Sequence, residues 1–175
     1  MPTIGDHRPL SSAAGVERAA DDAEFAEWLD RVRSTYEAVL YTCAHRLSDP
    51  RLAGPVAVQV AAGLVSRPTV FRYFGLPYSG RIARLAEARL AEAEAGTLSA
   101  VCDWAELHSR LEGLPAEHRE VLVAVCVRGE DVPTLARGLG CDERSAAARR
   151  ASTLAFMHDV AAPGLPDAPD PEGED

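Results

Sequence analysis

Apolar residues recur every three or four positions along most of the chain, which is the spacing of one face of an α-helix. The first such run covers residues 25–47 and follows Asp21 and Asp22, either of which is suited to cap a helix. A stop signal, Ser-Asp-Pro, then occupies residues 48–50. The pattern therefore predicts an amphipathic helix near the start of the chain.

Residues 56–65 form a second segment that is apolar on almost every side. This composition is typical of a buried helix. A β-strand is the alternative, because Val56, Val58 and Val60 alternate with other residues, but no hairpin partner lies nearby. We expect the helix.

Five further helices are predicted, over about residues 80–95, 97–113, 115–129, 132–139 and 142–160. Gly96 ends the first of them, Thr97 caps the second and Pro115 opens the third. Arg84 and Arg89 are predicted to face outward on the first. The pattern indicates an all-α protein with two small helical lobes, 21–95 and 98–161, between an N-terminal extension over 1–20 and a tail over 162–175.

The formal charge of −9, from 27 acidic and 18 basic residues, would normally count against a nucleic-acid-binding protein. However, the last thirteen residues, Pro163–Asp175, contain five acids and no base. A segment of proline and acidic residues cannot bury enough apolar surface to fold, so we expect the tail to be disordered. The folded body is then close to neutral.

Several classes of protein are disfavoured by what the chain lacks. It has no apolar run long enough to span a membrane and no signal-type segment over residues 1–10, so we expect a cytoplasmic protein. No enzyme motif, metal site or cofactor site is predicted, because the five histidines lie apart and the cysteines lack a paired short spacing. The cysteines are Cys43, Cys102, Cys126 and Cys141.

The most informative segment has the layout of a helix-turn-helix. Residues 132–139 predict a short helix, and Gly140 permits a sharp turn into a longer one. Ala136 is small, as the crossing of two helices requires, and Asp142 can cap the second helix. A plain helical hairpin that packs on a partner is the alternative interpretation.

The same segment resembles region 4 of bacterial sigma factors of the extracytoplasmic-function type. The resemblance is carried by the Leu-Pro and Arg-Glu-Val-Leu residues in 114–122 and by the Leu-Ala and Leu-Gly pairs in 132–142. It implies that Ser145 and Arg149 lie on the helix that reads the −35 promoter element. Together with Arg144 and Arg150, these are our candidates for contact with duplex DNA.

Several residues depart from the region 4 pattern. Ala146 replaces a core valine, and Ala147 stands where a basic residue is usual. Asp142 and Glu143 add negative charge at the end of the helix that would approach DNA. Because affinity rises with the number of phosphates neutralised, we expect this helix to bind phosphate weakly.

The N-terminal half resembles region 2 of the same family, on residues 36–41, 44–47 and 82–84. Between them, residues 67–81 interleave aromatic residues with arginines, a composition suited to gripping single-stranded DNA. The candidates for the −10 side are Arg72, Tyr73, Phe74, Arg81 and Arg84. The alternative for this stretch is a small apolar core with arginines on its surface.

Residues 61–74 also resemble the recognition half of the helix-turn-helix of tetracycline repressors, in which a Gly-Val-Ser turn precedes an aromatic helix. Here Leu64 is an extra residue in the turn, and Pro68 lies inside the expected helix. This short similarity ranks second among the DNA-binding interpretations.

Two features depart from a working sigma factor. The run over residues 53–60 has only Gln59 as a polar residue, where the family uses acids to bind RNA polymerase. The connection over residues 95–98 is much shorter than the family's linker, so we expect the lobes to pack on each other. The apolar helix is predicted to contact a partner through Val56, Val58, Gln59 and Val60.

The resemblances together imply transcription regulation by a divergent sigma factor or a sigma-like protein. Its expected partners are promoter DNA, core RNA polymerase, and an anti-sigma or other regulatory protein. The alternative is a sigma-derived module that binds proteins and not DNA.

Overall fold

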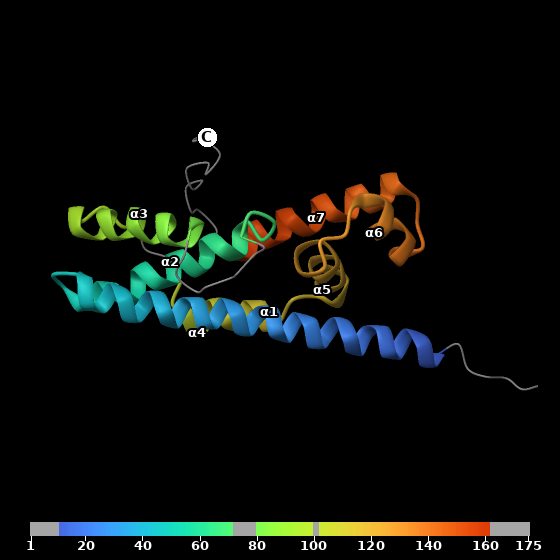
Figure 1. Ribbon diagram of the computed structural model, residues 1–175, viewed down its shortest axis with the longest axis horizontal. Helices are drawn as coiled ribbons and strands as arrows, with labels where there is room; N and C mark the ends of the chain where they lie inside the picture. Colours follow the sequence, from blue (N-terminus) through green and yellow to red (C-terminus); the bar gives the residue numbers. More distant parts are fainter. Residues whose placement is uncertain (1–10, 72–79, 100–101, 162–175) are drawn as a thin grey trace, which may run out of the picture.

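The computed structural model describes residues 11–71, 80–99 and 102–161. Every regular element in these residues is helical, which confirms the all-α prediction (Figure 1). The predicted tail over 162–175 lies outside the described residues. The elements are α1 (Ser11–Arg46), η1 (Pro50–Leu52), α2 (Ala53–Ser66), α3 (Arg81–Ala95), α4 (Trp104–Glu112), α5 (Ala116–Leu122), the π-helical η2 (Val123–Val127), α6 (Val132–Leu139) and α7 (Glu143–Ala161).

Helix α1 begins ten residues before the predicted cap at Asp21. The first turns, over residues 11–20, contain four alanines, and adding residues to an existing helix costs less than starting a new one. The predicted N-terminal extension is therefore wrong for residues 11–20, which belong to the helix. Residues 1–10 lie outside the described residues.

Helix α2 lies at the centre of the fold, packed against α1, α3, α4 and α7 (Figure 1). All residues from Val56 to Val65 are buried, so the buried-helix prediction is confirmed and the β-strand alternative is wrong. The turn that the tetracycline-repressor resemblance requires at Gly63 and Leu64 lies inside this continuous helix. The helix-turn-helix implied by that resemblance is therefore absent.

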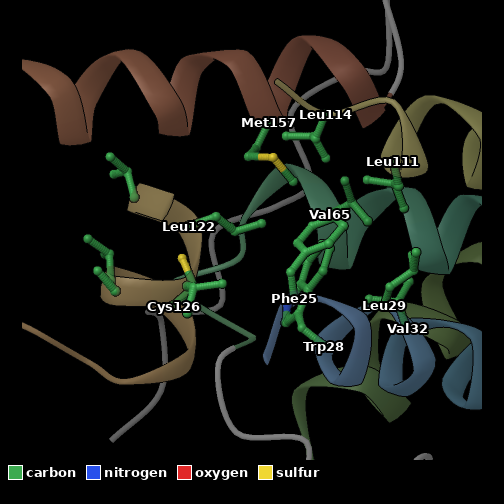
Figure 2. Packing of buried hydrophobic residues seen from close by; sticks show 14 of the residues in the cluster. Phe25, Trp28, Leu29, Val32, Val65, Leu111, Leu114, Leu122, Cys126 and Met157 are labelled. Carbon is green, nitrogen blue, oxygen red and sulfur yellow. The ribbon is translucent and has the colours of Figure 1, made fainter. Parts of the chain in front are cut away.

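Two clusters of buried apolar residues hold the helices together. The N-terminal cluster joins the second half of α1 to α2 and α3, and includes Val39, Val56, Val60, Leu64 and Ile82. The shared cluster joins the first half of α1 to α2, α4, α5, η2, α6 and α7 (Figure 2). Its members include Phe25, Trp28, Val32, Val65, Leu107, Leu111, Leu122 and Met157. The shared cluster thus combines side chains from both predicted lobes.

The connection after α3 differs from the prediction at Thr97. Gly96 adopts φ 72°, and the backbone N–H of Thr97 donates to the Glu92 carbonyl at 2.9 Å, which closes α3. Thr97 therefore completes one helix and does not cap the next. The cap of α4 is Asp103, whose carboxylate accepts from the Glu106 N–H at 2.8 Å.

One polar side chain of α3 lies on the opposite side from the one predicted. Arg89 is buried and not outward, and its guanidinium pairs with Glu92 at 2.7 Å. The pairing at i and i+3 satisfies the charge within the same helix, which makes the burial tolerable. Among the described residues, none of the helices combines the length and apolar character that crossing a membrane requires.

Candidate nucleic-acid interface

Local capping interactions shape the joint between α6 and α7. The Thr134 N–H donates to the Asp131 carboxylate at 2.9 Å and starts α6 at Val132, as predicted. At the other end, Gly140 adopts φ 67°, and the Cys141 N–H donates to the Ala136 carbonyl at 3.1 Å. A left-handed glycine is what this sharp turn needs.

The start of α7 is capped by Asp142, as predicted. The Ser145 backbone N–H donates to its carboxylate at 2.7 Å. This hydrogen bond, followed by one with the Ser145 hydroxyl, holds the pKa of the Asp142 carboxyl below its usual range. A carboxylate thus occupies the helix end to which a phosphate would bind.

Helix α7 is held to the rest of the protein along one side. Ala146 and Met157 are buried in the shared cluster, the former at the crossing with α6. The His118 Nδ1 atom of α5 lies 2.8 Å from the Thr153 hydroxyl, and its ring stacks on Phe156 with centroids 4.2 Å apart. These contacts orient the opposite side of α7 toward solvent.

The four duplex-contact candidates lie on α7 with different exposure. Arg144 and Ser145 are exposed in its first turn. Arg149 has 41% of its side chain exposed and lies 3.7 Å from the Glu120 carboxylate, and Arg150 is partly buried. The structure therefore places two candidates fully in solvent and ties a third to an acid of α5.

The candidates for the −10 side are only partly described. Arg81 and Arg84 are exposed in the first turn of α3, and the Arg81 guanidinium donates to the Val70 carbonyl at 3.0 Å. Phe71 is buried in the N-terminal cluster, consistent with the apolar-core alternative at that position. The other three candidates, Arg72, Tyr73 and Phe74, lie outside the described residues.

The predicted partner contacts of α2 are covered by the protein itself. Val56, Val58, Gln59 and Val60 are each at most 3% exposed. The Gln59 amide donates to the Ser99 carbonyl on the connection after α3. The prediction that these residues contact a partner is wrong for this conformation, because the chain's own helices surround α2.

An acidic site around Arg128 was not predicted from the sequence. Its guanidinium pairs with Asp21 at 2.7 Å and with Glu24 at 3.0 Å, on α1. These hydrogen bonds, chiefly the one from Glu24, raise the pKa of Arg128. Only the arginine preceding Gly129 is visible as a local signal, since its partners lie more than a hundred positions away.

Metal-binding and thiol chemistry find little support in the described residues. No group of three or more histidine, cysteine or acidic side chains is arranged there to hold a metal ion. The four cysteines, all in the described part, form no disulfide. Burial raises the pKa of both Cys43 and Cys102, which disfavours the reactive thiolate.

No protein-family model, curated protein or solved structure matches this chain. The similarity to sigma factors therefore depends on the sequence motifs alone and stays a prediction.

Proposed function

We propose that the protein is a cytoplasmic, sigma-like regulator of transcription that binds duplex DNA through the start of α7 and acts with core RNA polymerase. The supporting observation is the joint between α6 and α7. There Gly140 turns the chain, Ala146 packs inward, and Arg144 and Ser145 remain exposed in the first turn. A helix presented in this way can enter the major groove with its first turn toward the bases.

The affinity of α7 for DNA alone is expected to be low. Asp142 and Glu143 lie in the same turn as the exposed Arg144, and Arg149 is drawn toward Glu120. Few phosphates can be neutralised by such a surface. In this proposal, polymerase contacts and the arginines of the −10 side, including Arg81 and Arg84, supply the remaining binding energy.

The test compares duplex binding by two triple variants. Replacing Arg144, Arg149 and Arg150 by alanine is expected to weaken binding to a labelled duplex in fluorescence anisotropy. The slope of log affinity against log salt should become shallower by about one for each arginine that contacts a phosphate. The control variant replaces Arg31, Arg33 and Arg51, which are also exposed. It changes the charge equally and should keep the wild-type slope; equal losses in both variants would contradict the proposed interface.

Polymerase association has its own test. The full-length protein is expected to co-purify with core RNA polymerase from its own cells, and to bring promoter fragments with it in chromatin immunoprecipitation. Failure to co-purify would reject the polymerase part of the proposal and leave the duplex part to the binding experiment.

A protein-binding module that does not bind DNA is the second candidate. It is favoured by the pairing of Arg149 with Glu120 and by the acidic cap of α7, because both reduce the positive potential of this surface. An anti-sigma or other regulatory protein would be its partner. Duplex affinity that is unaffected by the triple arginine variant would favour this candidate.

A further inference from the structure

A pocket of about 220 Å³ opens between the first turns of α1, the continuous α5–η2 helix, and α6. Its apolar lining consists of Ala20, Ala124, Leu135 and Leu139. Ala124 and Leu135 are buried, so they form its base, whereas Ala20 is exposed. The base offers an apolar surface to a side chain that enters from solvent.

Carboxylates surround this apolar base. Glu17, Asp21, Glu120 and Glu130 all line the pocket, and Arg128 is the one cation among its lining residues. Arg128 is already engaged by Asp21 and by the nearby Glu24. Within the described residues no cation pairs with Glu17 or Glu130, so the pocket retains negative charge.

This combination fits the arginine side chain. Its aliphatic part can lie on apolar surface while its planar guanidinium donates to several carboxylates at once. The fold provides an internal example, because the Arg128 guanidinium binds two carboxylates of α1 at the same place. Charge complementarity therefore selects a cationic occupant with a long stem.

A second observation shows that the occupant extends beyond the pocket. Val16 is 68% exposed, one of two large hydrophobic side chains in the described residues that are exposed. It lies one helical turn before Ala20, a pocket residue, and therefore on the same side of α1. All side chains over residues 13–20 are exposed, and this end of α1 forms one end of the molecule (Figure 1). The apolar stripe of small residues and Val16 leads directly to the pocket.

We propose that the pocket and the adjoining face of α1 bind a helical segment of a partner protein, which inserts an arginine side chain into the pocket. The partner helix packs its apolar residues along Val16 and Ala20. Its guanidinium binds Glu17 and Glu130. This interaction is independent of the proposed binding of DNA by α7.

The charge requirement is tested with a helical alanine–glutamine peptide that carries two leucines and one central arginine. A matched peptide has citrulline, which has nearly the same shape and no charge, in place of the arginine. In fluorescence anisotropy with the full-length protein, the arginine peptide is expected to bind about tenfold tighter. The Glu17→Gln, Glu130→Gln double variant should abolish the difference. The control Glu27→Gln, Glu37→Gln, on exposed sites of α1 outside the pocket lining, should keep it.

The role of the apolar stripe is tested separately. Val16→Ser is expected to weaken binding of the peptide several-fold without changing the binding of N-acetyl-arginine amide, followed by amide shifts of Gly138 and Leu139. Equal affinity for the two peptides would overturn the proposal. Tighter binding of the free arginine derivative would show a small-molecule site instead. Self-association in sedimentation that the Glu17, Glu130 variant removes would show that a second copy is the occupant, and would also overturn it.

Discussion

Arg128 and Asp21 are 107 positions apart in the sequence, yet the Arg128 Nη2 atom donates to the Asp21 carboxylate at 2.7 Å. The contact joins the end of the π-helical η2 to the first half of α1. It lies beside the shared cluster, in which the same two elements bury Trp28 and Cys126. One arginine thus links segments from both predicted lobes at the surface, above the apolar contacts that join them inside.

Arg128→Met is expected to lower the free energy of unfolding by about 1 kcal/mol at low salt, and by less at high salt, because the side chain is partly solvated. Chemical denaturation at two salt concentrations measures both effects. The control is Arg33→Met, whose exposed pairing with Asp30 lies within one helix, and which should change stability by less than about 0.5 kcal/mol. A loss at Arg128 that does not depend on salt would contradict the electrostatic explanation.

Two glycines near the end of α6 are expected to respond in opposite directions to alanine. Gly138 lies inside the helix, and an added Cβ meets no atom within 4 Å, so Gly138→Ala should stabilise the protein by up to about 1 kcal/mol. Gly140 has φ 67°, so Gly140→Ala should destabilise it by about 1–2 kcal/mol. Thermal denaturation of both variants gives the comparison. Two changes of the same sign would show that the turn is not as described.

The central position of α2 predicts that the two apolar clusters unfold together. Leu64→Ala in the N-terminal cluster and Leu107→Ala in the shared cluster should each cost about 2–5 kcal/mol. Trp28 is in the shared cluster and Trp104 packs against it, so tryptophan fluorescence reports on that cluster alone. In Leu64→Ala, the fluorescence and circular-dichroism transitions are expected to shift equally. A fluorescence transition that stays at the wild-type midpoint would mean that the lobes unfold independently.

Asp142→Asn tests the contribution of α7 to DNA binding without removing the helix cap. Asparagine caps about as well as aspartate, so stability should change little, while the loss of negative charge should raise duplex affinity several-fold. Asp103→Asn is the matched control, since Asp103 caps α4 by the same hydrogen bond to a backbone N–H. If both variants gain equally, the gain reflects net charge and not the position of α7.

The same cap residues predict a loss of stability in acid. Hydrogen bonds from Thr134 and Ser145 hold the pKa values of Asp131 and Asp142 below the ordinary value of 3.8. A carboxyl whose pKa is lowered by folding stabilises the folded state above its ordinary pKa. That contribution disappears as the pH falls through the lowered value. The Asp131→Asn, Asp142→Asn variant should therefore lose less melting temperature than the wild type between about pH 5 and about pH 2. An identical loss would assign the acid sensitivity to other carboxylates.

The structure agrees best with the sequence where the signals are local. The bounds of α6, the end of α3 at Gly96 and the capping role of Asp142 all follow from hydrogen bonds between residues a few positions apart. The errors arise where distant segments meet. Arg89 looks like a surface residue in a helical pattern, and its burial follows from how α3 packs on α2.

The candidate interface divides in the same way. Its helix and turn could be predicted, because Gly140 and the cap residues are readable in the sequence. The pairing of Arg149 with Glu120 could not, since nothing local brings α5 and α7 together. The acidic pocket was missed for the same reason: its walls come from three elements that only packing brings together.

The sequence by itself determined the helices, their caps and the apolar face of each, because these depend on intervals of a few residues and on the backbone preferences of glycine and aspartate. Tertiary structure decided which faces remain exposed. It buried α2 completely, paired Arg128 with α1 and left Val16 and Arg144 in solvent. The physical reason is that burial of apolar area is non-directional, so the partner of each apolar face is chosen by the whole set of packed helices and not by any one segment.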